Sequence, residues 1–219
     1  MVDKKLLNYL EGFITPRRKQ LFTEVLAQRT NFYTVVIEDV YQLHNTSAVI
    51  RSCDVFGIQQ AHVIEERNRK KIDREIAMGA QKWVSIHRHH HTRDCINRLK
   101  EKGYQIVATT PHQPAVALSN FNFSKPSAFF FGQEQGGLSE DVLNAADSRL
   151  YIPMYGFTES LNISVSAAII LQSATQHLQN SELTWQLTEE EQLYLRWEWT
   201  KKVLKSHDQL IAKYYEIHN

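Results

Sequence analysis

The sequence predicts an α/β protein whose mostly parallel sheet is covered by helices on both faces. Short apolar segments alternate with segments of helical periodicity, which is the order of elements in a βαβ protein. The apolar segments are apolar at successive positions, as in strands that are buried on both faces. We therefore expect one α/β domain at residues 31–180, with helical extensions at 1–30 and 181–219.

The apolar strands and the helices between them follow from local signals. The predicted strands cover residues 33–38, 61–65, 84–89, 104–110, 127–132 and 149–153. The predicted helices cover residues 44–57, 71–83 (a short helix and a turn), 92–103, 139–147 and 163–179. Thr92 and Ser139 are expected to cap helices with their hydroxyls, and Gly57 and Gly103 to end them.

The two ends of the chain are predicted to be helical. Thr15 is placed to cap a helix in the first thirty residues, because Pro16 suits the first helical position. A single long amphipathic helix is expected over 188–219, with acidic residues in its first turn. Its aromatic residues are expected to pack the helix rather than to stack on bases.

Composition excludes several classes of protein. Of the 219 residues, 42% are apolar and 22% charged, as in an ordinary globular protein. Lys and Arg number 25 against 24 Asp and Glu, so nucleic acid would have to be bound by a local basic patch. Cys53 and Cys95 are too few for a secreted disulfide framework. The sequence has no signal-peptide core and no apolar window of about 18 residues. We therefore expect a cytoplasmic location and no membrane partner.

Polar residues gather after three predicted strands, where parallel sheets bind ligands. The segments are 44–54, the strand end and glycine-rich turn at 129–139, and 152–169. Each also has a structural interpretation: the Asn and Ser side chains would cap helices, and Arg51 would pair with Asp54 three residues on. Dinucleotide, P-loop and hydrolase-elbow motifs are absent from the sequence.

Together, the three segments resemble the motifs of the SPOUT superfamily of RNA methyltransferases. The likeness is greatest to the tRNA ribose 2′-O-methyltransferases that modify guanosine 18 of the D-loop, the TrmH family. The first motif appears as Asn45-Thr46-Ser47-Ala48, Arg51, Asp54 and Gly57. The second appears as Phe131-Gly132-Gln133-Glu134 and Gly136-Gly137-Leu138-Ser139, and the third as Ile152-Pro153-Met154 and Ser160-Leu161-Asn162-Ile163-Ser164-Val165.

The resemblance implies a C-terminal deep trefoil knot, a homodimer with its sites at the subunit interface, and S-adenosylmethionine as cofactor, with no metal. Cofactor-binding residues implied by the resemblance are Thr109, Gly132, Ile152, Met154 and Leu161. Glycine at such a position is expected to let the backbone approach the ligand.

The resemblance also assigns catalytic roles. Arg51 is implied to activate the ribose 2′-hydroxyl, with support from Asn45, Glu134, Ser160 and Asn162. Because the pKa of arginine exceeds about 12, a second interpretation is that Arg51 binds the adjacent phosphate and stabilises the developing alkoxide. The sequence leaves both interpretations open.

Basic residues near these motifs predict contact with tRNA, although a charge run is also typical of a solvated face. The expected RNA-binding residues are Arg18, Arg29, Arg67, Arg69, Lys70 and Lys71. Histidines at 87 and 89–91 are expected to form a polar strand end rather than a metal site, because alternate histidines of the strand are expected to face opposite sides and no carboxylate or cysteine partner is expected nearby. Alternatives to tRNA guanosine 18 are ribosomal RNA, the tRNA wobble position, or a non-catalytic RNA-binding module.

Overall fold

The chain divides into two units by its internal contacts. One unit comprises residues 1–29 together with 186–219, and the other comprises residues 30–185. The computed structural model describes residues 2–66, 77–112, 114–133 and 136–218.

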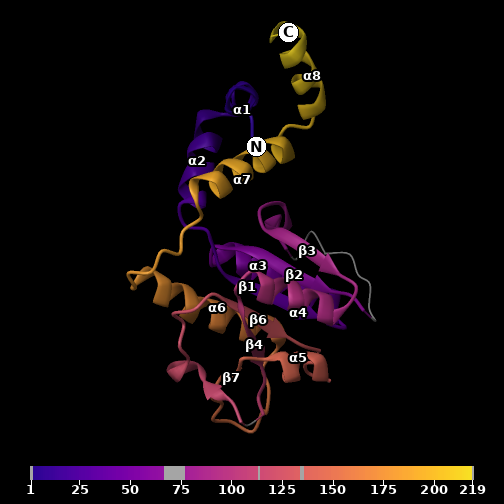
Figure 1. The fold of residues 1–219 in the computed structure, drawn as a ribbon, viewed down its shortest axis with the longest axis vertical. Helices are drawn as coiled ribbons and strands as arrows, with labels where there is room; N and C mark the ends of the chain where they lie inside the picture. The colour runs from indigo at the N-terminus through magenta and orange to yellow at the C-terminus, as the bar shows by residue number, and fades with distance from the viewer. Residues whose placement is uncertain (1, 67–76, 113, 134–135, 219) are drawn as a thin grey trace. The chain divides into compact units, whose positions relative to one another are not determined.

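A parallel sheet of seven strands forms the centre of the 30–185 unit. Its order is β3-β2-β1-β6-β4-β7-β5, and each pair of neighbouring strands is parallel in the part of the chain described. Figure 1 labels all of these strands except β5. The strands are β1 (Thr30–Glu38), β2 (Ile58–Ile64), β3 (Ser85–His89), β4 (Gln105–Thr109), β5 (Val116–Ala117), β6 (Ser127–Phe131) and β7 (Ser148–Tyr151). The predicted α/β class is confirmed, and so are the six predicted strands, to within a few residues at their ends. No local signal predicts β5, a two-residue strand in a loop rich in proline.

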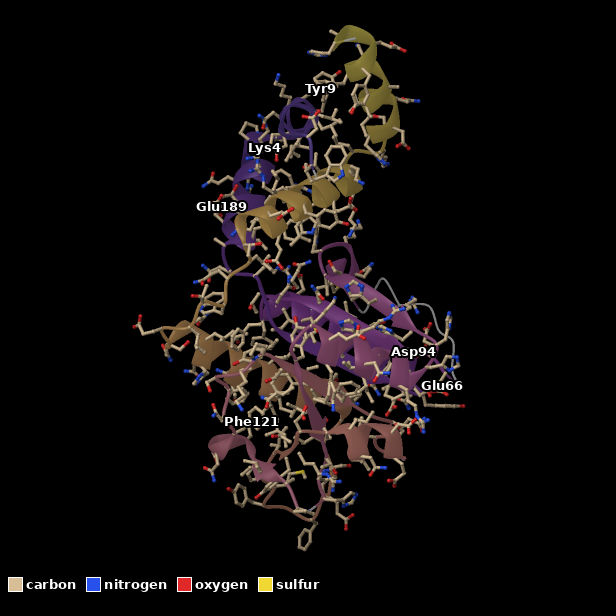
Figure 2. All side chains as sticks on the ribbon, in the orientation of Figure 1. Lys4, Tyr9, Glu66, Asp94, Phe121 and Glu189 are labelled. Carbon is tan, nitrogen blue, oxygen red and sulfur yellow. The ribbon has the colours of Figure 1, made fainter. Side chains whose placement is uncertain are left out.

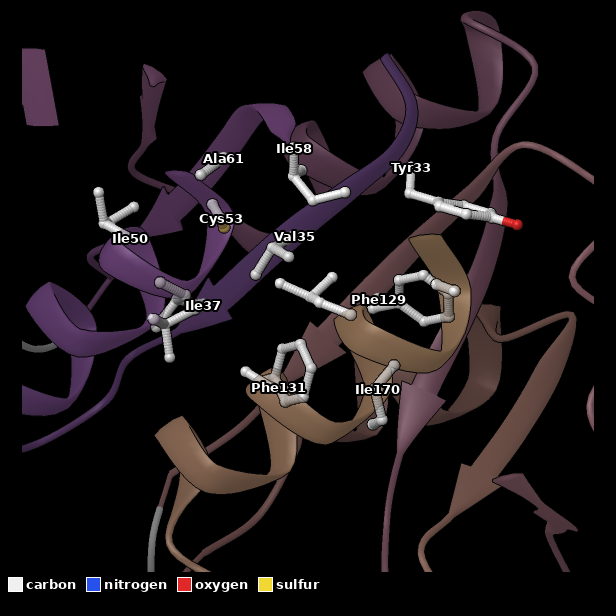
Figure 3. Packing of buried hydrophobic residues seen from close by; sticks show 14 of the residues in the cluster. Tyr33, Val35, Ile37, Ile50, Cys53, Ile58, Ala61, Phe129, Phe131 and Ile170 are labelled. Carbon is white, nitrogen blue, oxygen red and sulfur yellow. The ribbon is translucent and has the colours of Figure 1, made fainter. Parts of the chain in front are cut away.

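Helices cover both faces of the sheet. Alternate residues of the buried strands point to opposite sides, so the apolar runs along β1 and β6 supply two cores. On one side, Val35 and Phe129 pack with Ile170 and with residues of α3 (Figure 3). On the other side, Phe130 packs with residues of α4 and α5.

The helices of this unit begin at the expected residues in most cases. They are α3 (Leu43–Val55), α4 (Thr92–Glu101), α5 (Glu140–Ala145) and α6 (Ile163–Gln179), with short 3₁₀ turns at Ala80–Lys82 and Leu118–Asn120. Ser139 caps α5, as expected, by accepting a hydrogen bond from the Val142 amide. The cap expected at Thr92 is wrong: Thr92 is the first helical residue, and its hydroxyl donates to Glu38 instead. Of the short helix and turn predicted at 71–83, residues 71–76 lie outside the described residues, and residues 77–83 form a turn that contains the 3₁₀ helix Ala80–Lys82.

The unit formed by residues 1–29 and 186–219 is entirely helical in its described part. It contains α1 (Lys4–Glu11), α2 (Pro16–Leu26), α7 (Glu189–Val203) and α8 (His207–His218). Thr15 caps α2 with Pro16 at its start, and Thr188 forms a capping box with Glu191, as the sequence indicates. The single helix expected over 188–219 is two helices, because the chain leaves helical geometry at Leu204.

An ion pair joins the two ends of the chain within this helical unit. Arg196 of α7 donates three hydrogen bonds to the buried carboxylate of Glu11 on α1, at 2.8 to 3.1 Å. Such a two-pronged, partly buried pair is stronger than an exposed one. Across the described chain, we find no helix with both the length and the apolar character needed to cross a bilayer.

Candidate active site

The carboxyl ends of four adjacent strands meet at one edge of the sheet. Because β1, β6, β4 and β7 are neighbours and parallel, the segments that follow them emerge side by side. The three polar segments singled out in the sequence follow β1, β6 and β7, as in the ligand-binding edge of other parallel sheets.

A hydrogen bond between two asparagines connects the first and third segments. Asn162 Nδ2 donates to Asn45 Oδ1 at 3.1 Å, and Asn45 is 1% exposed near the start of α3. Asn162 is also the cap of α6, because its Oδ1 accepts from the amide and hydroxyl of Ser164 at 2.8 and 2.6 Å. The helix-cap interpretation is therefore correct for Asn162, and the same side chain also positions Asn45.

Arg51 does not accompany Asn45 into this arrangement. Six residues along a helix correspond to a rise of about 9 Å and a rotation of about 120° away. Arg51 is exposed where Asn45 is buried, and the structure records no ion pair for its guanidinium with any described residue, Asp54 included. Ser160 is exposed in the loop before α6. The structure thus brings together two of the predicted catalytic residues, and it presents Arg51 and Ser160 to solvent.

The turn after β6 explains Gly132 in a way that the sequence did not suggest. Gln133 and Gly137 exchange backbone hydrogen bonds at 2.9 and 3.0 Å, which closes a tight loop back onto Gly132. A Cβ on Gly132 would lie 2.2 Å from the carbonyl oxygen of Gly137. The loop itself, rather than a ligand, therefore requires glycine at this position.

The other expected cofactor-binding residues lie at the same edge. Thr109 ends β4, and its hydroxyl donates to the Phe130 carbonyl at 2.7 Å. Ile152 and Met154 follow β7 and are half-buried, and Leu161 is exposed before α6. Among the described residues, no loop or turn backbone hydrogen bond involves residues 154–161.

Glu38 is a residue of this edge that sequence reasoning missed. It ends β1 and is 3% exposed, and its carboxylate accepts from the Ser139 amide and hydroxyl at 2.9 and 2.7 Å and from the Thr92 hydroxyl at 2.7 Å. Glu38 thereby fixes the start of α5 directly after the glycine-rich turn. The signal in the sequence was an acidic residue directly after the apolar run Val35–Ile37 at the end of a buried strand, since a buried carboxylate needs such donors.

The expected RNA-binding residues differ in their surroundings. Arg18 is exposed on α2. The prediction that Arg29 contacts RNA is wrong. Arg29 is 2% exposed, with its guanidinium 5.6 Å from the centre of the Trp199 ring, so it packs inside the helical unit instead of facing solvent. The expected catalytic Glu134 and the basic residues Arg67, Arg69, Lys70 and Lys71 lie outside the described residues.

Comparison with known proteins gives consistent matches. A tRNA (guanosine(18)-2'-O)-methyltransferase of Borreliella burgdorferi is 38% identical over 203 residues, which is 93% of both chains. The crystal structure of the A. aeolicus TrmH/SpoU tRNA modifying enzyme superposes with a TM-score of 0.79 at 31% identity, covering 86% of this chain and 97% of that one. An AdoMet-bound rRNA methyltransferase from Sinorhizobium meliloti has a TM-score of 0.62 at 28% identity, covering 69% and 58% of the two chains. Residues 33–172 match the profile of the SpoU rRNA Methylase family, and with these relatives the chain belongs to that family.

Proposed function

We propose that this protein transfers a methyl group from S-adenosylmethionine to the ribose 2′-hydroxyl of guanosine 18 in tRNA. The observation that carries the proposal is the 203-residue match to the Borreliella enzyme, which necessarily extends beyond residues 30–185 into the terminal helices. A relative with the methyltransferase domain alone would share only the sheet and its helices. The polar edge of the sheet, joined by Asn45 and Asn162, supplies a site for the chemistry.

The residues at this edge fit a nucleoside cofactor. Thr109, Gly132, Ile152, Met154 and Leu161 come from the ends of three adjacent strands and from the loop that leads into α6. The backbone groups of 154–161 can bind an adenine edge, while Ile152 and Met154 offer apolar contact. When bound, S-adenosylmethionine supplies an electrophilic methyl group.

The side chains of this protein have the remaining tasks, which are to orient the ribose and to stabilise the charge that develops on its 2′-oxygen. The exposed guanidinium of Arg51 can approach a ribose and its phosphate from solvent, with two parallel donors. We assign Arg51 to that charge, because electrostatic stabilisation requires no loss of its proton. Asn45 and Asn162 hold the start of α3 against the start of α6, and Ser160 and Glu134 complete the proposed site.

Transfer to tRNA tests the proposal directly. The protein should incorporate labelled methyl from S-adenosylmethionine into unmodified tRNA, and mapping should place the label on the ribose of guanosine 18. The matched control is the same tRNA with a 2′-deoxy sugar at that nucleotide, which should accept no label. Methylation of ribosomal RNA or of the wobble nucleotide, with tRNA guanosine 18 untouched, would contradict it.

Contact with tRNA is proposed for Arg18 and for the basic residues at 67–71. The exposure of Arg18 on α2 supports its part, since phosphate contacts need accessible cations. Arg29, being buried, is not among the proposed contacts. A cytoplasmic location is proposed with the tRNA substrate.

A deep trefoil knot is part of the proposal. β6 lies between β1 and β4, β7 lies beyond β4, and α6 then packs against α3 on the β1 side. The chain must cross back past β6 to reach this position. Such a path supports threading of the C-terminal part of the domain, against the general rule that chains do not knot.

A homodimer is also proposed, because α6 and the loop before it carry exposed apolar side chains at Tyr155, Phe157, Leu161, Val165 and Ile169. Several exposed apolar side chains in one segment of the chain are typical of an interface.

Light scattering should therefore give twice the 25.5 kDa chain mass at micromolar concentration. Ile169→Asp should shift the mass toward that of one chain, because it would bury a charge in the interface. Asn97→Asp, an exposed position on α4 on the opposite face of the sheet, is the matched control and should leave the mass unchanged. A single-chain mass for the unmodified protein would rule out the dimer.

A further inference from the structure

Two histidines and a cysteine meet inside the sheet domain, near Glu38 but apart from the three polar segments described above. His62 comes from β2, His89 from β3 and Cys95 from α4, and one ligand atom from each lies within 4.8 Å of the others. His62 is 4% exposed, His89 is 7% exposed and Cys95 is fully buried. Neighbouring strands and the following helix thus converge on one enclosed group of nitrogen and sulfur ligands.

The strand register explains why the sequence did not reveal this cluster. His87 and His89 are two residues apart, so they share one face of β3, and both stack on His62 with ring centroids 4.9 and 5.1 Å away. The expectation that the histidines of this segment diverge holds for adjacent ones but is wrong for this pair. Cys95 is the thiol partner that was expected to be missing, brought in by the first turns of α4.

The buried imidazoles have fewer hydrogen bonds than their burial calls for. His62 Nδ1 and His89 Nε2 are 2.9 Å apart and share one proton. His62 Nε2 is buried with no hydrogen-bond partner in the described structure. Buried polar atoms are nearly always satisfied, so two buried histidines that share one proton beside a buried thiol form a group that a bound cation would complete.

We propose that His62, His89 and Cys95 bind one divalent transition-metal ion, with zinc as the ion that their chemistry favours. Imidazole nitrogen and thiolate sulfur are the ligands zinc prefers, whereas Mg²⁺ and Ca²⁺ take oxygen ligands. In a tetrahedral zinc site the ligand atoms lie about 3.3 to 3.6 Å apart. The facing imidazole nitrogens, 2.9 Å apart, would therefore separate slightly, and any pair near the 4.8 Å limit would close by about 1 Å. The site links β2, β3 and α4, and the proposed methyl transfer does not depend on it.

The two kinds of ligand start from different protonation states. Burial, with a smaller contribution from His87, lowers the pKa of His62 to about 3, so the ring is neutral at physiological pH. Burial and the nearby Glu38 raise the pKa of Cys95 to about 12, so the ion must displace the thiol proton, and binding releases one proton. Asp94, labelled in Figure 2, and Glu38 favour a cation here, and Arg98 and Lys102 oppose it.

Cobalt substitution tests the site without reference to activity. The full chain, produced in medium with Co²⁺ in place of zinc, should contain about one cobalt ion and show a thiolate-to-cobalt charge-transfer band. Cys95→Ala should lose both. Cys53→Ala is the matched control, since Cys53 is equally buried but lies in the core on the other face of the sheet, and it should retain both (Figure 3).

Measurement on the unmodified chain tests the site even where a variant does not fold. Purified protein with no stoichiometric cobalt, or with cobalt but no thiolate band, would overturn the proposal. A band that persists in Cys95→Ala, or that disappears in Cys53→Ala, would assign the thiolate elsewhere and overturn it equally.

Discussion

Arg51→Ala is expected to lower the single-turnover rate of methyl transfer by about 100-fold or more, with little change in stability or in affinity for S-adenosylmethionine. The guanidinium is exposed and has no ion-pair partner in the described structure, so the fold does not depend on it. Removing a positioned donor from a developing oxyanion costs about two to three orders of magnitude in rate.

The control for this substitution is Arg98→Ala, which removes an exposed arginine from α4 on the opposite face of the sheet. Its rate should stay near that of the unmodified protein. Arg51→Lys keeps the charge but loses the planar pair of donors, so it should remain strongly impaired. If Arg51 only stabilises an alkoxide, raising the pH should partly restore the Lys variant. A near-normal single-turnover rate for Arg51→Ala would remove Arg51 from the proposed mechanism.

Gly132→Ala is expected to destabilise the protein by about 3 kcal/mol and to abolish measurable binding of S-adenosylmethionine. The added Cβ would meet the Gly137 carbonyl oxygen at 2.2 Å, and both groups belong to backbone that cannot rotate away. The turn between β6 and α5 must therefore open, which displaces one wall of the proposed cofactor site. Urea unfolding measures the first effect, and titration calorimetry measures the second.

Gly156→Ala is the matched control for stability. An added Cβ there meets nothing within 4 Å, and the backbone is not in the left-handed region. Its free energy of unfolding should stay within about 0.5 kcal/mol of the unmodified value. Equal stabilities for the two variants would show that the Gly132 turn tolerates a side chain, contrary to the geometry.

Local signals were sufficient to predict most of the sheet domain. The bounds of α6 follow from Asn162 as a cap and from a continuous apolar helix, and both are confirmed. The buried strands were recognisable because apolar residues at successive positions fit a two-sided core. Thr92 was expected to be a cap because threonine commonly precedes a helix. Its hydroxyl instead donates to a carboxylate 54 residues away, which nothing in the local sequence indicates.

The parts of the site that the sequence did not reveal depend on contacts between distant segments. The bond between Asn162 and Asn45 spans 117 residues, and its existence is set by the packing of α6 on α3. Arg29 resembles a surface cation in the sequence because burial of an arginine depends on a partner, here the Trp199 ring from the other end of the chain. The ligand cluster of His62, His89 and Cys95 likewise requires the register of β2 with β3.

The order of strands in the sheet has a consequence for how the protein is made. β1 is an inner strand, flanked by β2 and by β6, and Val35 pairs with Phe129 from much later in the chain. During synthesis, β1 and β2 can associate early, but one edge of β1 stays open until Ser127–Phe131 leaves the ribosome. An open apolar edge is prone to pair with other chains, and long-range parallel pairing is slow. The nascent chain therefore has a long interval in which aggregation competes with completion of the sheet.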